Sequence, residues 1–192
     1  LREGSRLALN NLQRAADLVR RLKRSSIDLD VMERRVFKLA DLIDDVLLGQ
    51  KERLELARVN VSVDCPDELI LDGVPGLYEQ LLTTLLGNAV RHAFPVQGRD
   101  ARLTLSAAIG PDMRLHLSCE DNGVGMPGEA QVHIFEPFFT TRRADGCLGL
   151  GLYLCYNLVT SRLGGTIDCV SAVGQGTTIR AHVPAVTGEM KS

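Results

Sequence analysis

The sequence predicts an α+β fold, a two-layer α/β sandwich preceded by one long helix of a helical bundle. Three observations predict it: a seam of apolar and small residues over 1–27, pairs of alternating segments that form hairpins, and amphipathic helices between them. Hairpin-linked strands with helices on one face give this class, whereas a doubly wound sheet needs parallel strands. The 192 residues suffice for one full-sized domain and a short extension.

The first segment has the periodicity of a bundle helix. Apolar or small residues recur at spacings of four and three at Leu1, Ser5, Ala8, Leu12, Ala15, Val19, Leu22 and Ser26. This a/d seam is typical of a coiled coil or four-helix bundle, and a helix cannot bury it alone. We therefore expect a partial helical-bundle domain over 1–30, whose partner helix lies outside this chain or in a second copy. Its basic outer face suits either docking of an acidic protein or simple solvation.

The other segments predict a second domain over 31–192. Helical periodicity runs over 39–56, 75–94 and 148–163, and strand-like alternation over 59–64, 102–109, 113–119, 166–170 and 177–183. Pro75 is a favourable first helical residue and Pro95 stops that helix, while Gly164 and Gly165 close the last one. Pro111 and Asp112 supply a turn between two strands.

The composition excludes several classes of protein. A net charge of −2 and an aromatic content of 4% without Trp argue against nucleic acid as a partner. No apolar run reaches the roughly 20 residues that span a bilayer, and there is no signal peptide. The five cysteines lie far apart without zinc-like spacing, which suits a reducing cytoplasm. The chain begins without Met, and we expect it to be a fragment of a longer protein.

The helix that begins at Pro75 has a polar face that is a candidate site. Gln80, Thr84, Asn88, Arg91 and His92 follow one another at spacings of four, three and one. The Asn88 carbonyl oxygen suits Mg²⁺, which takes few protein ligands, and Arg91 and His92 suit phosphate oxygens. A merely solvated helix face remains the alternative interpretation.

Two glycine-containing motifs are the next candidates. Asp121, Gly123 and Gly125 directly follow a predicted strand, where the carboxylate can accept a hydrogen bond from an exocyclic amine. A plain turn is the alternative. Gly149 and Gly151 open the helix predicted over 148–163, and backbone N–H groups there favour an anion. Neither a P-loop nor a dinucleotide fingerprint fits this second motif.

The segment between these motifs, 122–148, predicts a long loop with about one helical turn. A loop of this length in a compact domain is usually functional or mobile. Three of the chain's eight aromatic residues occur within 135–139, which indicates a lid with its own hydrophobic anchor. Arg142 and Arg143 follow Thr140 and Thr141, where they are placed to approach a triphosphate.

Together the four motifs resemble the catalytic ATP-binding domain of sensor histidine kinases of two-component systems, in the superfamily shared with gyrase and mismatch-repair ATPases. The family's N, G1, F and G2 boxes correspond to 85–92, 121–126, 135–141 and 149–152, and the ending over 163–184 is also similar. The resemblance covers roughly 35–185. The helix over 1–27 is similar to the second helix of the family's dimerisation and phosphoacceptor domain.

The resemblance implies roles for individual residues. Asn88 would be the Mg²⁺ ligand and, with Arg142, a catalytic residue, while Asp121 would read the adenine amino group. The nucleotide would contact Asn88, Arg91, His92, Asp121, Gly123, Gly125, Thr141, Arg142, Gly149, Leu150, Gly151 and Thr177. There are two departures from the family: Thr84 stands where the family often has Asn and related ATP hydrolases carry Glu, and Cys147 and Leu148 replace a Gly and a Ser or Thr.

The function implied is transfer of the ATP γ-phosphoryl group to a histidine on a helix missing from this chain, and then to a response-regulator aspartate. We expect a cytoplasmic homodimer formed through the N-terminal helix, with a membrane reached only through parts absent here. Without the acceptor helix the chain should not autophosphorylate. A scaffold with a degenerate ATP pocket is the alternative, supported by the altered G2 box. A serine kinase that inhibits sigma factors is a third hypothesis, but it does not explain the seam helix.

Overall fold

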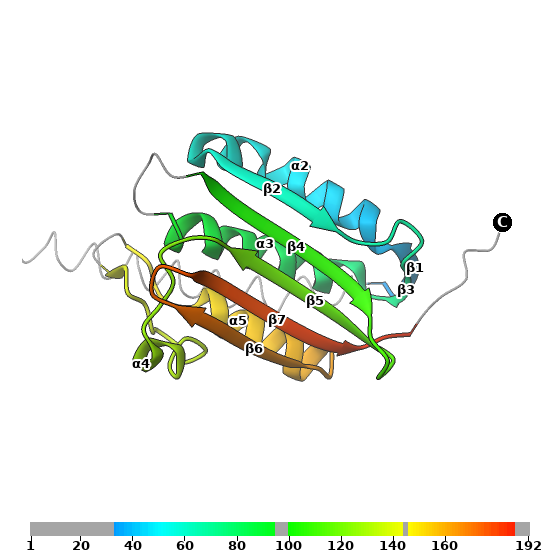
Figure 1. Cartoon of the computed structure of the whole chain (residues 1–192). Coiled ribbons are helices and arrows are strands. Elements are labelled where there is room, and N and C mark those ends of the chain that lie inside the picture. Colours follow the sequence, from blue (N-terminus) through cyan, green and yellow to red (C-terminus); the bar gives the residue numbers. More distant parts are fainter. Residues whose placement is uncertain (1–32, 95–99, 144–145, 187–192) are drawn as a thin grey trace, which may run out of the picture. The chain divides into compact units, whose positions relative to one another are not determined.

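The structure is a computed structural model that describes residues 33–94, 100–143 and 146–186. All of these except Glu33 belong to one compact unit, Arg34–Ser192. Its main feature is a five-stranded mixed sheet with the strand order β2-β4-β5-β7-β6, shown in Figure 1. The strands are β2 (Val59–Asp64), β4 (Ala101–Ile109), β5 (Arg114–Asp121), β6 (Thr166–Ala172) and β7 (Gly176–Pro184).

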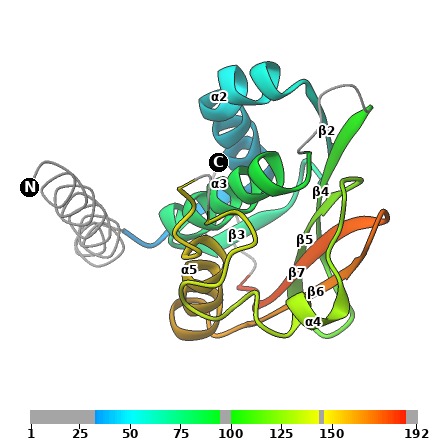
Figure 2. The same cartoon turned by 90° about the vertical axis from the view of Figure 1, so that its left-hand side faces the viewer.

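Three helices cover one face of this sheet, as Figure 2 shows. They are α2 (Leu39–Ala57), α3 (Pro75–His92) and α5 (Gly151–Asn157), and α3 packs between the other two. The strands alternate between buried and more exposed residues, most clearly in β4 and β5. Leu103, Leu105 and Leu115 are almost fully buried beneath the helices. The predicted two-layer α/β sandwich is therefore confirmed.

The hairpins β4–β5 and β6–β7 were predicted from the sequence. The antiparallel pairing of β5 with β7, which joins the two hairpins into one sheet, was not predicted. The central pairs are antiparallel, so Asp121 at the end of β5 lies opposite Thr177 near the start of β7. In contrast, β2 runs parallel to β4 at the edge of the sheet. A parallel pair needs a long crossover connection, and here that connection includes α3.

A small second sheet, β1 (Arg35–Lys38) with β3 (Ile70–Gly73), was not predicted. Its strands are antiparallel, and the guanidinium of Arg34 bonds the Asp72 carboxylate at 3.0 and 3.3 Å. The backbone N–H of Asp72 also donates to the carbonyl of Val186 at 2.8 Å. This sheet therefore joins the two ends of the described unit.

The helix predicted over 148–163 differs at both ends. Its α-helical part begins at Gly151 because Gly149 adopts a φ of +68°, which an α-helix cannot contain. From Leu158 to Arg162 the helix continues as a π-helix. In the preceding loop, the short helix α4 (Gly128–Gln131) provides the helical turn that was expected.

The predicted helix over 1–27 lies outside the described residues, and the proposed boundary after residue 30 remains a prediction. Among the residues that are described, no helix combines the length and the apolar character that a membrane span requires.

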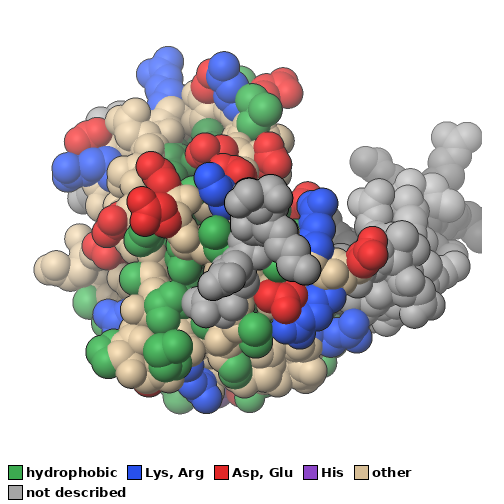
Figure 3. Space-filling view, turned by 90° about the vertical axis from the view of Figure 1, so that its right-hand side faces the viewer, with side chains coloured by type: hydrophobic (Ala, Val, Ile, Leu, Met, Phe, Trp, Pro, Cys, Tyr) green, Lys and Arg blue, Asp and Glu red, His purple; other side chains and the backbone are tan. Residues whose placement is uncertain are grey.

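The face of the unit near β1 and β3 is rich in acidic side chains, which Figure 3 shows over its upper part. Asp44, Asp64 and Asp67 lie near Cys65, and together with burial they raise the pKa of its thiol. This face is at the opposite end of the sheet from the end of β5 and the C-terminal end of α3 (Figure 1).

Candidate functional site

The first part of the candidate site surrounds Asp121, and we call it the Asp121 end: Asp121, Gly123, Ser171 and Thr177. Asp121 is only 8% exposed. The backbone N–H groups of Gly123 and Thr177 donate to its Oδ1 at 2.9 and 3.2 Å. Because both bonds go to one oxygen, Oδ2 keeps its lone pairs for a donor on a ligand.

Burial is the main influence on Asp121 and raises the pKa of its carboxyl group. The hydrogen bonds from Gly123 and Thr177 favour the charged form and work in the opposite direction, while the neighbouring Glu120 adds to the increase. A buried carboxylate of this kind is a strong acceptor for a neutral donor such as an amine.

Glycines allow the loop after Asp121 to pack tightly against its neighbours. A Cβ on Gly123 would overlap Ala93, at the end of α3. Gly125 has a φ of +63°, and a Cβ there would overlap the Ala172 carbonyl of β6. The Val124 N–H also donates to the Ala93 carbonyl at 2.9 Å. The DxGxG motif therefore connects three elements and is not a plain surface turn.

The second part of the site surrounds Asn88, and we call it the Asn88 end: Asn88, Arg91, His92 and Arg142. The side chain of Asn88 projects from α3 toward the first residue of α5. A Cβ on Gly151 would lie 2.6 Å from the Asn88 Oδ1, so glycine is what allows this approach. The Nδ2 of Asn88 is buried and has no hydrogen-bond partner among the described residues. The structure thus brings the N and G2 motifs into contact around an unpaired amide.

The lid reaches the same place. The guanidinium of Arg142 donates to the carbonyl oxygen of Arg91, in the last turn of α3. The Arg142 N–H bonds the Thr140 hydroxyl at 3.1 Å, whereas Thr141 itself is exposed. His92 lies on α3, one residue beyond Arg91, and is half-buried. Arg91, His92 and Arg142 therefore gather at the C-terminal end of α3.

The backbone at 149–151 forms a turn that positions the start of α5. Gly149 has a positive φ, and a Cβ there would crowd the backbone of Phe138 and Phe139 in the lid. Leu150 follows as a buried N-cap residue of α5. The phosphate-binding amides implied by the resemblance therefore belong to a turn that also holds the lid.

Three residues near the site were missed by the sequence analysis. Arg53 of α2 approaches the Gly87 carbonyl at 3.5 Å, and its pKa is lowered by burial and then by the nearby Arg91. Ser171 and Gln131 bond each other beside Thr177. The Arg53–Gly87 contact joins residues 34 positions apart and the Gln131–Ser171 contact joins residues 40 apart, so only a spatial signal such as covariation would have found them.

The hydroxyl of Thr84 is engaged within α3. Its hydroxyl donates to the Gln80 carbonyl at 2.7 Å, one turn earlier in α3, and it also approaches the thiol of Cys155 in α5. A neutral hydroxyl bound in this way cannot serve as a base for water.

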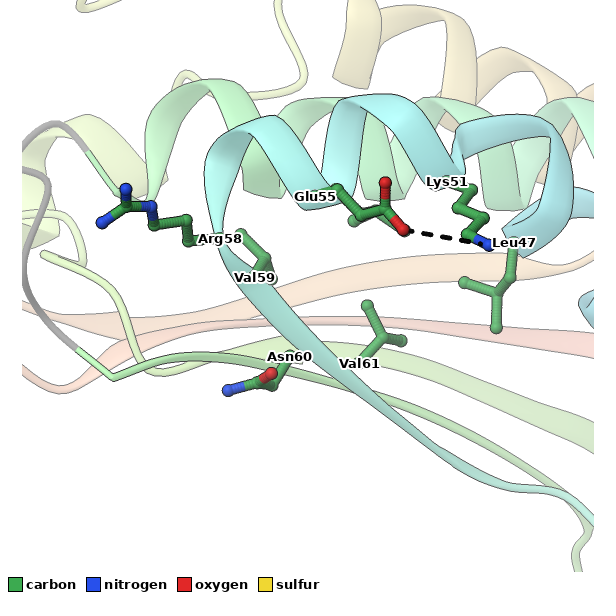
Figure 4. Close-up of a pocket in the computed structure, with 8 residues that line it drawn as sticks. Leu47, Lys51, Glu55, Arg58, Val59, Asn60 and Val61 are labelled. Carbon is green, nitrogen blue, oxygen red and sulfur yellow. Dashed lines mark ion pairs between the residues drawn. The ribbon is translucent and has the colours of Figure 1, made fainter.

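A separate hollow of about 450 Å³ lies between the end of α2 and the edge strand β2, two strands across the sheet from β5 and Asp121. Figure 4 shows Lys51, Glu55 and Arg58 around it, with Val59 and Val61 on its floor. An exposed Lys51–Glu55 ion pair at 3.9 Å lies beside it, and such pairs contribute little. Asn88, Asp121 and Thr177 do not line this hollow, so we do not assign the candidate site to it.

Comparison with known families agrees with the site's geometry. The model of the family described as histidine kinase-, DNA gyrase B-, and HSP90-like ATPase matches residues 73–187, which include Asn88, Asp121 and Gly151. The chain belongs to this family. Its domain is therefore an ATP-binding catalytic domain of the type found in sensor histidine kinases.

Curated relatives within the family are sensor kinases. The chain is 31% identical to the sensor kinase CckA of Brucella abortus over 95% of its own length and 20% of that protein. It is 40% identical to the sensor histidine kinase AruS of Pseudomonas aeruginosa over 78% of its own length and 15% of that protein. The chain thus spans a fifth or less of the length of these two relatives.

Solved structures share the fold at lower identity. The histidine kinase ThkA, in complex with the response regulator TrrA, has a TM-score of 0.70 and 22% identity over 94% of this chain and 50% of that one. Full-length ShkA in complex with AMPPNP has a TM-score of 0.69 and 22% identity over 82% of this chain and 32% of that one. These likenesses support the fold of the domain.

Proposed function

We propose that this domain transfers the γ-phosphoryl group of ATP to a histidine on a dimerisation helix outside the 192 residues, from which it passes to an aspartate of a response regulator. The observation that carries the proposal is the contact between Asn88 and Gly151. It brings the N and G2 motifs together around an amide whose Nδ2 has no hydrogen-bond partner among the described residues.

The residues at the Asn88 end fit a magnesium ion and a triphosphate. Mg²⁺ takes one or two protein oxygens and completes its shell with water and phosphate oxygens, and a side-chain amide supplies such an oxygen. In the described residues, no group of three or more His, Cys, Asp or Glu is arranged to hold a metal. When bound, the ion would neutralise charge on the phosphates.

In this proposal the two ends divide the nucleotide between them. Asp121 and Thr177 hold the adenine, and Gly123 and Gly125 let the backbone approach it. Arg91, His92, Arg142 and Thr141 contact the phosphates with the turn over 149–151. Phosphoryl transfer depends mainly on positioning and charge neutralisation, which these residues supply.

The position of Thr84 favours a kinase over an efficient hydrolase, because no carboxylate is present there to activate water. We also propose that the protein acts as a homodimer through the helix predicted over 1–27 and that its recipient is a response regulator. ThkA, a fold relative, was solved with such a regulator, which supports the second point.

Two proteins test the proposal: this chain and a longer chain that includes the upstream helix. With labelled ATP, only the longer chain should become labelled, with the acid-labile and base-stable chemistry of phosphohistidine. Asn88→Ala in the longer chain should abolish labelling, whereas Thr84→Val should preserve it. Labelling of a histidine within the 192 residues would refute the placement of the acceptor.

A scaffold function is the competing proposal, and the Cys147–Leu148 departure in the G2 box favours it. Cys147 is buried, so this part of the loop packs inward. Calorimetry with ATP and Mg²⁺ separates the two functions. A domain that binds no nucleotide, in a longer chain that never becomes labelled, would be a scaffold.

A further inference from the structure

The side-chain amide of Gln131 in α4 bonds the free edge of the main sheet. Its Nε2 donates to the Ser171 carbonyl at 2.6 Å, and its Oε1 accepts from the Ser171 N–H at 3.1 Å. The same Nε2 lies 3.4 Å from the Met126 carbonyl. Because β6 is the last strand of the sheet, the amide of Gln131 takes the place of a further strand at this residue. We call this arrangement of Gln131, Ser171 and Met126 the Gln131 bridge.

The Gln131 bridge holds Ser171 from outside the sheet at the residue where β6 meets Thr177 of β7. These residues are directly opposite each other on β6 and β7. Since both backbone groups of Ser171 point outward to Gln131, the pair does not exchange backbone hydrogen bonds, and side chains of such pairs approach most closely. The two hydroxyl oxygens are indeed 3.0 Å apart.

The hydrogen-bond partners of Ser171 fix the direction of that contact. A hydroxyl has one proton, and the Ser171 proton goes to the Gly176 carbonyl at 2.8 Å. The Met126 N–H donates to the same Ser171 oxygen at 2.9 Å. Ser171 can therefore only accept from Thr177, whose own proton is used in this bond. The Thr177 hydroxyl is left with lone pairs alone.

A second acceptor lies beside this hydroxyl. The Thr177 N–H donates to Asp121 Oδ1, so the two residues are held together, and the ionised Asp121 is also an acceptor only. A site that presents two acceptors favours a ligand with an amino group and disfavours one with a carbonyl oxygen. An unmatched buried acceptor costs free energy, which is how such a site discriminates.

We propose that Gln131 is a positioning residue for base selection: through Ser171 it orients the Thr177 hydroxyl as an acceptor, so that the site prefers an aminopurine over an oxopurine nucleotide. This inference rests on the proposed nucleotide site and adds a residue outside its motifs. It also connects the base of the lid, where α4 lies, to the Asp121 end.

The test compares binding of ADP and GDP by calorimetry in the unmutated chain, Gln131→Ala and Glu129→Ala. Glu129 is exposed in the same short helix and serves as the control. Without Gln131 the outward-facing N–H and carbonyl of Ser171 lose this partner, so β6 is held at Ser171 from the β7 side alone and the Ser171 hydroxyl is positioned less firmly. We expect Gln131→Ala to weaken ADP binding about 3- to 10-fold, as for loss of one or two hydrogen bonds, with little change for GDP. Glu129→Ala should change neither.

Gln131→Glu adds a readout that a purely structural role would not give. In its ionised form, the introduced carboxylate would face the carbonyls of Ser171 and Met126 and lose both bonds. As a carboxylic acid the same side chain can donate again while its other oxygen accepts. The ADP affinity of this variant, divided by that of the unmutated chain, should therefore recover as the pH falls toward about 4–5. Taking the ratio removes the effect of Asp121, which titrates in both proteins.

Hydrogen exchange of the Ser171 amide supplies a measurement that needs no nucleotide, and it should accelerate in Gln131→Ala. If that exchange accelerates but the ratio of ADP to GDP affinity is unchanged, Gln131 only anchors α4 and the inference is overturned. A pH-independent ratio for Gln131→Glu would also overturn it. If the unmutated chain binds neither nucleotide, the proposed function fails first and the inference falls with it.

Discussion

The Asp121 end and the Asn88 end of the site are built differently. At the Asp121 end, the carboxylate, the Thr177 N–H and hydroxyl, and Ser171 form a continuous network of hydrogen bonds. At the Asn88 end, the Asn88 Nδ2 is buried without a partner among the described residues. Arg142 there bonds the backbone carbonyl of Arg91, so two cationic residues lie together.

This difference indicates which half of the nucleotide each end is prepared for. A site whose acceptors are already fixed binds a rigid, neutral base with little ordering cost. Cations gathered at one end of a helix are suited to a flexible, highly charged triphosphate, and the lid can order around it. We therefore expect the Asp121 end to determine selectivity and the Asn88 end to respond to phosphates and Mg²⁺.

The largest expected effect comes from disrupting the Asp121 end through Gly176→Ala. Gly176 has a φ of +84°, and its Cβ would overlap the carbonyl of Asp121. We expect the free energy of unfolding to fall by more than about 3 kcal/mol, from strain and overlap together. Urea denaturation measures this loss.

Gly174→Ala is the matched control in the same hairpin. Its φ is +78°, but a Cβ there meets nothing within 4 Å. It should cost only the conformational penalty of about 1–2 kcal/mol. Equal losses in the two variants would show that contact with Asp121 is unimportant.

The next largest effect is expected for Asp121→Asn. The new Oδ1 can still accept from Gly123 and Thr177, so the fold should persist. The new amide N–H₂ would face the amine of the base, and ADP affinity should fall by roughly 10- to 150-fold, the equivalent of about 1.5–3 kcal/mol. Calorimetry checks affinity and circular dichroism checks the fold. Retained ADP binding would contradict the assignment of Asp121.

Because the pKa of Asp121 is raised, its contribution to the stability of the domain and its contribution to adenine binding should depend on pH in opposite directions. The folded domain binds the proton more tightly than the unfolded chain does, so this group's contribution to stability is largest below the unfolded pKa of 3.8 and is lost as the pH rises through the raised folded pKa. Adenine binding needs the carboxylate and should weaken as the pH falls through that raised pKa. In Asp121→Asn both effects should disappear.

A moderate effect is expected for Asn88→Ala at the other end. ATP affinity in Mg²⁺ should fall about 10-fold, because a ligand oxygen is lost, while binding of adenosine should be unchanged. Stability should change by less than about 1 kcal/mol, since the buried Nδ2 has no bond to lose. Titrations with and without Mg²⁺ provide the measurement. An equal loss for adenosine would show that the two ends are not separable.

The smallest effect is expected for Thr84→Val. The Thr84 hydroxyl already donates to the Gln80 carbonyl within α3, so it has no proton left for a phosphate oxygen. ATP affinity should change by less than about threefold, and stability by about 1 kcal/mol or less. Parallel calorimetry and urea denaturation measure both. A large loss of ATP affinity would assign Thr84 to the site after all.

The sequence predicted elements whose signals are local and continuous. Strand β2 occurs at the residues where alternation predicted it, and α2 differs by one residue at its end. The sequence analysis missed β1 and β3, because a strand of four residues is too short to show an alternating pattern. The start of α5 was misplaced because the positive φ of Gly149 depends on the lid packed against it.

In the candidate site, too, the sequence predicted the motifs but not the contacts between elements. The motif residues Asn88, Asp121 and Thr177 lie at the two ends described above, although their roles remain predictions. The contact between Asn88 and Gly151 depends on how α3 packs against α5, and no spacing along the chain encodes it. Arg53 is similar, because it reaches the Gly87 carbonyl from another helix.

The hydrogen bonds of Asp72 bring the ends of the described unit together, which makes this domain suitable for circular permutation. Asp72 bonds Arg34 at the start of the described unit and Val186 near its end. The points where the chain enters and leaves this domain therefore lie side by side, at the edge where β1 and β3 pair (Figure 1). Domains with adjoining ends tolerate circular permutation. A short linker across Asp72, with new termini opened in the exposed turn at 111–113, should give a permuted protein with an intact sheet.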